Sequence, residues 1–146
     1  MMSFCATKAQ NINGVMKEAH YLTDKMAMAL VLDSEQRDKV LQYNTSYLQS
    51  ISNHNQLYGK TWRERNKKLQ KALSSKQWKL YKNTSCFYKP IGWKGNGYIH
   101  NIYIVYPEMA PSSPLLKGRT KLFDNNSKEA IQMRKKMRKG IKVGAR

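Results

Sequence analysis

The sequence predicts a mainly α-helical fold, with four amphipathic helices arranged as two helical hairpins, followed by a small β-hairpin and a basic C-terminal tail. Three observations lead to this class. Apolar side chains recur at helical spacing up to about residue 81, and two capping sequences divide that region. After residue 85 the pattern changes to a short aromatic and β-branched run. The 146 residues suit one domain, which we place at residues 10–106.

The first nine residues, MMSFCATKA, look like the end of a secretory signal peptide. They carry no charge before Lys8, and Thr7 and Ala9 are small residues at the −3 and −1 positions of a cut before Gln10. The sequence therefore predicts export to the periplasm or beyond, whereas an uncleaved chain that keeps Met1 would be cytoplasmic. It contains no run of about 18 apolar residues, so no transmembrane segment is expected.

The first two helices are predicted from their apolar spacing. One runs from about residue 14 to residue 31, with an apolar face made by Val15, Ala19, Leu22, Met26, Ala29 and Leu30. Asp33 can cap the next helix, and Gln36, three residues further on, completes a capping box. This second helix is expected to end near the polar cluster at residues 52–55. Its apolar residues are Val40, Leu41, Tyr43, Tyr47, Leu48 and Ile51.

The second pair of helices repeats this arrangement. A third helix carries Tyr58, Trp62, Leu69 and Leu73 on its apolar side. Ser74 can cap a fourth helix, and Gln77 again lies three residues later. The frame Leu-cap-x-x-Gln therefore occurs twice, 41 positions apart, which indicates an internal repeat of helical hairpins. The alternative is coincidence, because capping boxes are common.

A β-hairpin is predicted over residues 86–106, turning at Lys94-Gly95-Asn96-Gly97, with Pro90 at an edge. The segment is rich in aromatic rings: Tyr88, Trp93, Tyr98, Tyr103 and Tyr106. We expect these rings to form the core of the hairpin in preference to a base-stacking surface. Residues 107–146 are then a Pro-containing linker and a basic tail, in which a helix is expected over residues 128–139.

Positive charge is concentrated in two segments. The formal net charge is +18, and residues 60–94 carry eleven Lys and Arg against the single acid Glu64. Residues 117–146 carry eleven more against two acids. Such a field favours an anionic macromolecule, although a solvated surface with no single partner is the plain alternative. The binding residues we expect are Trp62, Arg63, Arg65, Lys67, Lys68, Lys71, Lys76, Lys79, Arg134, Lys135 and Lys136.

Catalytic and cofactor motifs are not found in the sequence. His20, His54 and His100 fall in a helix, a turn and a strand without a shared metal-ligand spacing, and there is no P-loop or nucleophile elbow. Of the two cysteines, Cys86 beside Phe87 is expected to be a packed hydrophobic residue. We expect a protein that is not an enzyme and that uses no cofactor and no metal.

Two resemblances follow from these residues. The frames Leu32-Asp33-Ser34-Glu35-Gln36 and Leu73-Ser74-Ser75-Lys76-Gln77 resemble the LTxxQ motif of Spy-like periplasmic helical proteins, with Asp33 and Ser74 in place of Thr. Residues 21–107 look like an uncharacterised family of small secreted proteins from Gram-negative gut anaerobes. That resemblance lies in the run beginning Tyr21-Leu22-Thr23-Asp24, then Tyr58-Gly59 and Trp62, then Phe87-Tyr88-Lys89-Pro90 and Trp93.

Both resemblances imply export, and the Spy-like one implies a basic helical protein that holds unfolded clients. The expected function is therefore a non-catalytic exported basic protein that binds anionic or unfolded partners in a chaperone-like or stress-related role. The alternative is a nucleic-acid-binding protein that uses residues 60–94 and 117–146.

Overall fold

The structure, a computed structural model, describes residues 2–95, 97–110 and 135. Within these residues the protein is mainly helical with one small antiparallel sheet of two strands, as the sequence predicts. The longer helices are α1 (Met2–Leu30), α2 (Ser34–Ser50), α3 (Lys60–Ala72) and α4 (Ser75–Asn83). The remaining elements are η1 (His54–Gln56), α5 (Ser85–Tyr88), β1 (Ile91–Lys94), β2 (Gly97–His100), α6 (Asn101–Val105) and η2 (Pro107–Met109).

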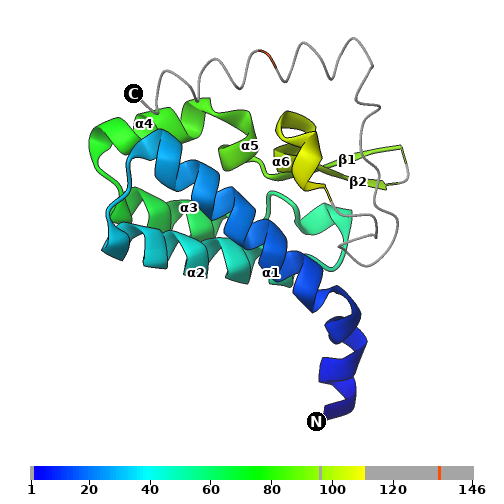
Figure 1. Ribbon diagram of the computed structural model, residues 1–146. Coiled ribbons are helices and arrows are strands. Elements are labelled where there is room, and N and C mark those ends of the chain that lie inside the picture. The colour runs from blue at the N-terminus through cyan, green and yellow to red at the C-terminus, as the bar shows by residue number, and fades with distance from the viewer. Residues whose placement is uncertain (1, 96, 111–134, 136–146) are drawn as a thin grey trace.

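The helices pack around two adjoining apolar clusters. α2 and α3 lie side by side, α1 crosses them, and α4 packs against α1 and α3 (Figure 1). One cluster joins the C-terminal half of α1 to α3, α4, α5 and α6, with Leu22, Met26 and Phe87 fully buried. The other joins the middle of α1 to α2 and the hairpin through Ala19 and Tyr47. These clusters confirm the predicted apolar faces of the first two helices.

Two predicted boundaries are wrong. α1 begins at Met2, twelve residues before the predicted start, since its apolar period becomes regular only from Val15. The β-hairpin is shorter than residues 86–106: Ile91 pairs with His100 and Lys94 with Gly97, and both flanking segments are short helices. In α6, residues 102–105 are buried on all sides, and such a short apolar run does not distinguish a strand from a helix.

The two capping frames meet in space. Gln36 and Gln77 each accept from the backbone N–H of their own N-cap residue, as the capping boxes predict. The amide of Gln36 also donates to the carbonyl of Ala72, at the end of α3, over 3.0 Å. The amide of Gln77 donates to the carbonyl of Leu30, at the end of α1, over 3.1 Å. The two amides also bond to each other at 2.7 Å, so one clasp closes both helical joints.

A strained residue lies inside this clasp. Val31 follows α1 with φ of 56°, a left-handed conformation that glycine usually supplies at the end of a helix. The N–H of Leu32 reaches back to the carbonyl of Ala27 over 3.1 Å, which is the wide hydrogen bond of a helix-ending motif. A β-branched side chain here costs about 1–2 kcal/mol, which the clasp and the apolar clusters offset.

Candidate functional site

Exposed cations form two rows, one on α3 and one on α4. In α3, Arg65 and Leu69 face the core. The α3 row on the opposite side consists of exposed residues at helical spacing: Lys60, Arg63, Lys67 and Lys71. The α4 row consists of exposed residues spaced three apart: Lys76, Lys79 and Lys82. At about 1.5 Å per residue, the α3 row extends over roughly 16 Å.

One carboxylate lies close to these rows: Glu64 is exposed on α3, one turn from Lys60 and from Lys67. Among the residues that the structure describes, no Asp or Glu lies within ion-pair distance of any cation of either row. Exposed ion pairs are found on α1 and α2, where Arg37 pairs with Asp24 and Lys39 with Glu35. The positive field of α3 and α4 is therefore left available to an external anion.

Arg65 is not a surface residue, which corrects the prediction that placed it among the exposed cations. Only 2% of it is exposed, and its guanidinium reaches across the core. Nε donates to Oδ1 of Asn44 over 2.9 Å, Nη1 to the hydroxyl of Tyr81 over 2.8 Å and Nη2 to the carbonyl of Phe87 over 2.9 Å. One side chain thus ties α3 to α2, α4 and α5. Arg65 lies two residues from Arg63, which on a helix turns it to the far side.

Trp62 packs against neighbouring segments and is only partly exposed at the surface. It is half-buried, and its indole N–H donates to the carbonyl of Tyr88 over 2.7 Å. Its ring meets Tyr58 and Tyr88 edge to face, with centroids 5.4 Å and 5.0 Å away. These contacts hold α5 and the start of the hairpin against α3, so Trp62 sets the position of neighbouring groups.

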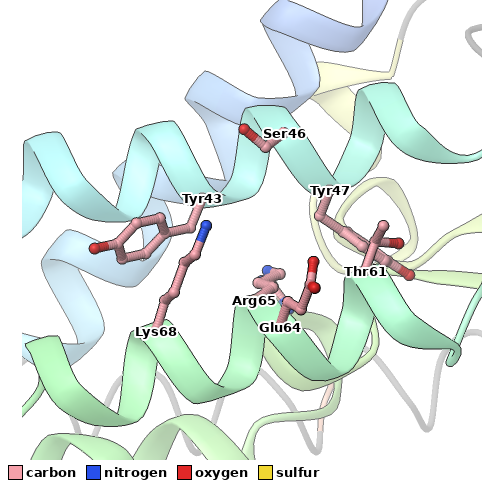
Figure 2. Close-up of a pocket in the computed structure, with 7 residues that line it drawn as sticks. All are labelled: Tyr43, Ser46, Tyr47, Thr61, Glu64, Arg65 and Lys68. Atoms are coloured by element: carbon pink, nitrogen blue, oxygen red, sulfur yellow. The ribbon is translucent and has the colours of Figure 1, made fainter.

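Lys68 belongs to a small depression between α2 and α3 (Figure 2). Its ammonium lies 5.7 Å from the ring centroid of Tyr43, and Glu64 is on the same wall. The depression encloses about 70 Å³ and is lined by Tyr43, Ser46, Tyr47, Thr61, Glu64, Arg65 and Lys68. Such a space is far below the size of a typical small-molecule site. Burial raises the pKa of Tyr47 above its ordinary value, and the Arg65 cation opposes that shift.

The predicted tail residues fall almost entirely outside the described part of the chain. Arg134 and Lys136 lie outside it, as does most of the helix expected over residues 128–139. Lys135 is described as helical and exposed. The site is therefore argued from α3, α4 and the segments packed against them.

A buried pair of side chains, Glu18 and His100, joins α1 to β2, and no sequence pattern predicts it. Nδ1 of His100 lies 2.8 Å and 2.9 Å from the two carboxylate oxygens of Glu18, and both residues are at most 1% exposed. The other ring nitrogen, Nε2, is buried without a hydrogen-bond partner. Burial and the Glu18 carboxylate both raise the pKa of the adjacent Tyr103. The partners are 82 positions apart in sequence, so only the packing of the hairpin on α1 brings them together.

Cys86 is fully buried, as predicted, and burial raises the pKa of its thiol to about 12.

Within the described ranges, no group of three or more His, Cys, Asp or Glu side chains could hold a metal ion. No helix of that same part of the chain is both long and apolar enough to cross a membrane.

Comparisons with known proteins identify no relative of this chain. No protein-family model, no curated protein and no solved structure matches the chain. The function is therefore argued from the geometry of the rows and their surroundings.

Proposed function

We propose that this protein binds a linear anionic polymer through the α3 row, with the α4 row adding to the attraction, and that its role is non-catalytic. The observation that carries the proposal is the row itself, four exposed cations on one side of a single helix with no carboxylate paired to them. A polymer gains affinity from each contact because it releases the counterions condensed on it.

The non-catalytic part of the proposal is supported by the burial of two reactive side chains, His100 and Cys86. His100 is fully buried and its Nδ1 is held by Glu18, so its ring does not meet a substrate at the surface. The Cys86 thiol is buried and stays protonated, since burial raises its pKa to about 12. A buried thiol with a raised pKa is a poor nucleophile.

The test compares two charge-matched double variants. K67Q/K71Q removes two cations from the α3 row, whereas K17Q/K39Q removes two exposed lysines from α1 and α2 and leaves the same net charge. Affinity for a labelled oligothymidylate of about 12 nucleotides is measured by fluorescence anisotropy between about 50 and 200 mM salt.

We expect K67Q/K71Q to weaken binding and to reduce the slope of log K against log salt by about 1.4, or about 0.7 for each lost phosphate contact. K17Q/K39Q should leave that slope close to the parent value. Equal losses in the two variants would show that net charge alone governs binding, and would contradict the proposal. Absence of binding at the lower salt concentration would contradict it as well.

Holding unfolded clients in the cell envelope is a second candidate function. What supports it is the meeting of Gln36 and Gln77, because these two joints carry the resemblance to LTxxQ proteins. The exposed methionines argue against a continuous client surface along α1, since Met16 and Met28 lie more than three turns apart on that helix. Suppression of client aggregation by an envelope form that starts near Gln10 would favour this candidate.

A further inference from the structure

Three exposed aromatic rings are carried by segments near the N-terminal end of α3, and we call them the aromatic patch: His54, Tyr58 and Trp93. Tyr58 is 41% and Trp93 37% exposed, although most large rings of the described chain are buried or half-buried. The His54 ring stacks on Trp93 with centroids 4.3 Å apart and planes 14° from parallel. The hydroxyl of Tyr58 donates to the carbonyl of Ile91, two residues before Trp93, over 2.9 Å. This hydrogen bond brings Tyr58 to the strand that carries Trp93.

The fold holds this patch in place from several sides. Trp93 pairs across the hairpin with Tyr98, whose ring meets it edge to face at 5.0 Å. η1, which carries His54, is closed by a capping box of Asn53 and Gln56. The rings are thus presented by a paired strand and a capped turn, so a ligand that stacks on them loses little of their conformational freedom.

Cations lie near Tyr58, at the side of the patch where the α3 row begins. The ammonium of Lys89 lies 5.2 Å from the ring centroid of Tyr58. Lys60, the first cation of the α3 row, follows Tyr58 by two residues and is exposed. The segments that carry the patch, residues 51–63 and 86–95, contain no Asp or Glu. Aromatic rings therefore lie near the start of a row of cations whose acidic neighbour, Glu64, forms no ion pair with the row.

We infer that the aromatic patch is a base-stacking site and that the polymer bound by the α3 row is single-stranded nucleic acid. This inference rests on the proposed function and narrows it to one partner class. Phosphates would lie along the α3 row while an unpaired base stacks on the patch, the combination by which proteins hold single strands without reading sequence. Polyphosphate and anionic lipid headgroups would use the row but carry no ring for the patch. Bases in a duplex are already stacked and do not reach it.

The closing experiment separates bases from phosphates. The full chain is titrated with an oligothymidylate of about 12 nucleotides and with an abasic strand of the same length, which keeps the sugar–phosphate backbone. We expect the oligothymidylate to bind more tightly by roughly 5- to 150-fold, the range for one stacked base. Tryptophan fluorescence should be quenched by the oligothymidylate and not by the abasic strand.

Variants assign this preference to the patch. H54S/W93V removes two rings and places a β-branched residue in the strand, so it should bring the two affinities together while leaving abasic binding unchanged. H54S alone, in an exposed turn, should lower the preference while leaving the residues of both hairpin strands unchanged. W78L is the matched control, because Trp78 is a half-buried ring of the α4 surface outside the patch. It should keep the full preference.

Each remaining outcome counts against a defined part of the inference. Equal binding of the two strands by the parent protein would overturn base stacking and leave the α3 row intact. Tighter binding of a duplex or of a heparin fragment than of the oligothymidylate would overturn the assignment to single strands. Failure to bind either strand would overturn the proposed function itself.

Discussion

Arg63 and Arg65 are two positions apart in the sequence, yet replacing them should affect different properties of the protein. Arg65→Met removes a buried guanidinium that donates to Asn44, Tyr81 and the carbonyl of Phe87. Arg63→Met removes the same chemical group from an exposed position in the α3 row. We expect R65M to lose stability and R63M to lose binding.

The expected loss in the free energy of unfolding of R65M follows from the acceptors that lose their donor. The side-chain oxygen of Asn44 and the carbonyl of Phe87 lose a charged donor in the interior, at about 1–3 kcal/mol each. The Tyr81 hydroxyl keeps its own bond to Asn66 and loses less. Relief from burying an uncompensated charge offsets part of the sum. We therefore expect a loss of about 3–5 kcal/mol for R65M, and a change within about 0.5 kcal/mol for the exposed R63M.

Urea unfolding followed by far-UV circular dichroism measures both free energies, and the midpoint should fall at an unchanged slope. In a thermal scan R65M should melt on the order of 10–20 °C below the parent protein. Arg65→Lys should fall between the two, since an ammonium cannot span three acceptors as the guanidinium fork does. If R65M is as stable as R63M, or if it loses polymer binding while still folded, the assignment of Arg65 to the core is wrong.

Three further predictions concern the clasp, its strained residue and the buried tyrosines. Q36A and Q77A should each lower the free energy of unfolding by about 1–2 kcal/mol, and Q36A/Q77A by less than their sum, because the two amides share a bond; additive losses would contradict the clasp. Val31→Gly should raise the free energy of unfolding by about 1 kcal/mol by relieving the left-handed strain, and a loss of stability would contradict that reading. Burial raises the pKa of Tyr81 from 10.0 to about 12, so the folded state keeps its proton after the unfolded state has lost it. Its contribution is full below pH 10 and is lost between pH 10 and about 12, and Y81F should make that alkaline loss shallower by about 1.4 kcal/mol per pH unit in urea titrations; an unchanged slope would refute it.

Local patterns were sufficient for much of the helical framework. The caps at Asp33 and Ser74 are predictable because a short polar side chain and a glutamine three residues later satisfy backbone groups within one turn. The apolar face of α1 from Val15 onward is predictable for a similar reason, since its period depends only on helix geometry. The segments around the hairpin were not, because a short apolar run such as residues 102–105 is equally suited to a buried helix.

The candidate site was also only partly predictable from the sequence. That residues 60–94 are strongly basic, and that most of these cations are exposed, could be concluded from the sequence, because Lys and Arg rarely lose contact with water. The burial of Arg65 could not be concluded from the sequence. Arg65 enters the core because acceptors from α2, α4 and α5 converge on its guanidinium. The aromatic patch of His54, Tyr58 and Trp93 could not be concluded from the sequence either, because its members come from separate segments.

The sequence by itself therefore determined the helical class, the two capped joints and the strong positive charge of residues 60–94, all of which depend on neighbouring residues or on composition. Only the tertiary structure decided which cations face solvent, that Gln36 and Gln77 close one clasp, and that Glu18 meets His100. Contacts between residues 41 and 82 positions apart are set by how whole helices pack, and no local spacing encodes that packing.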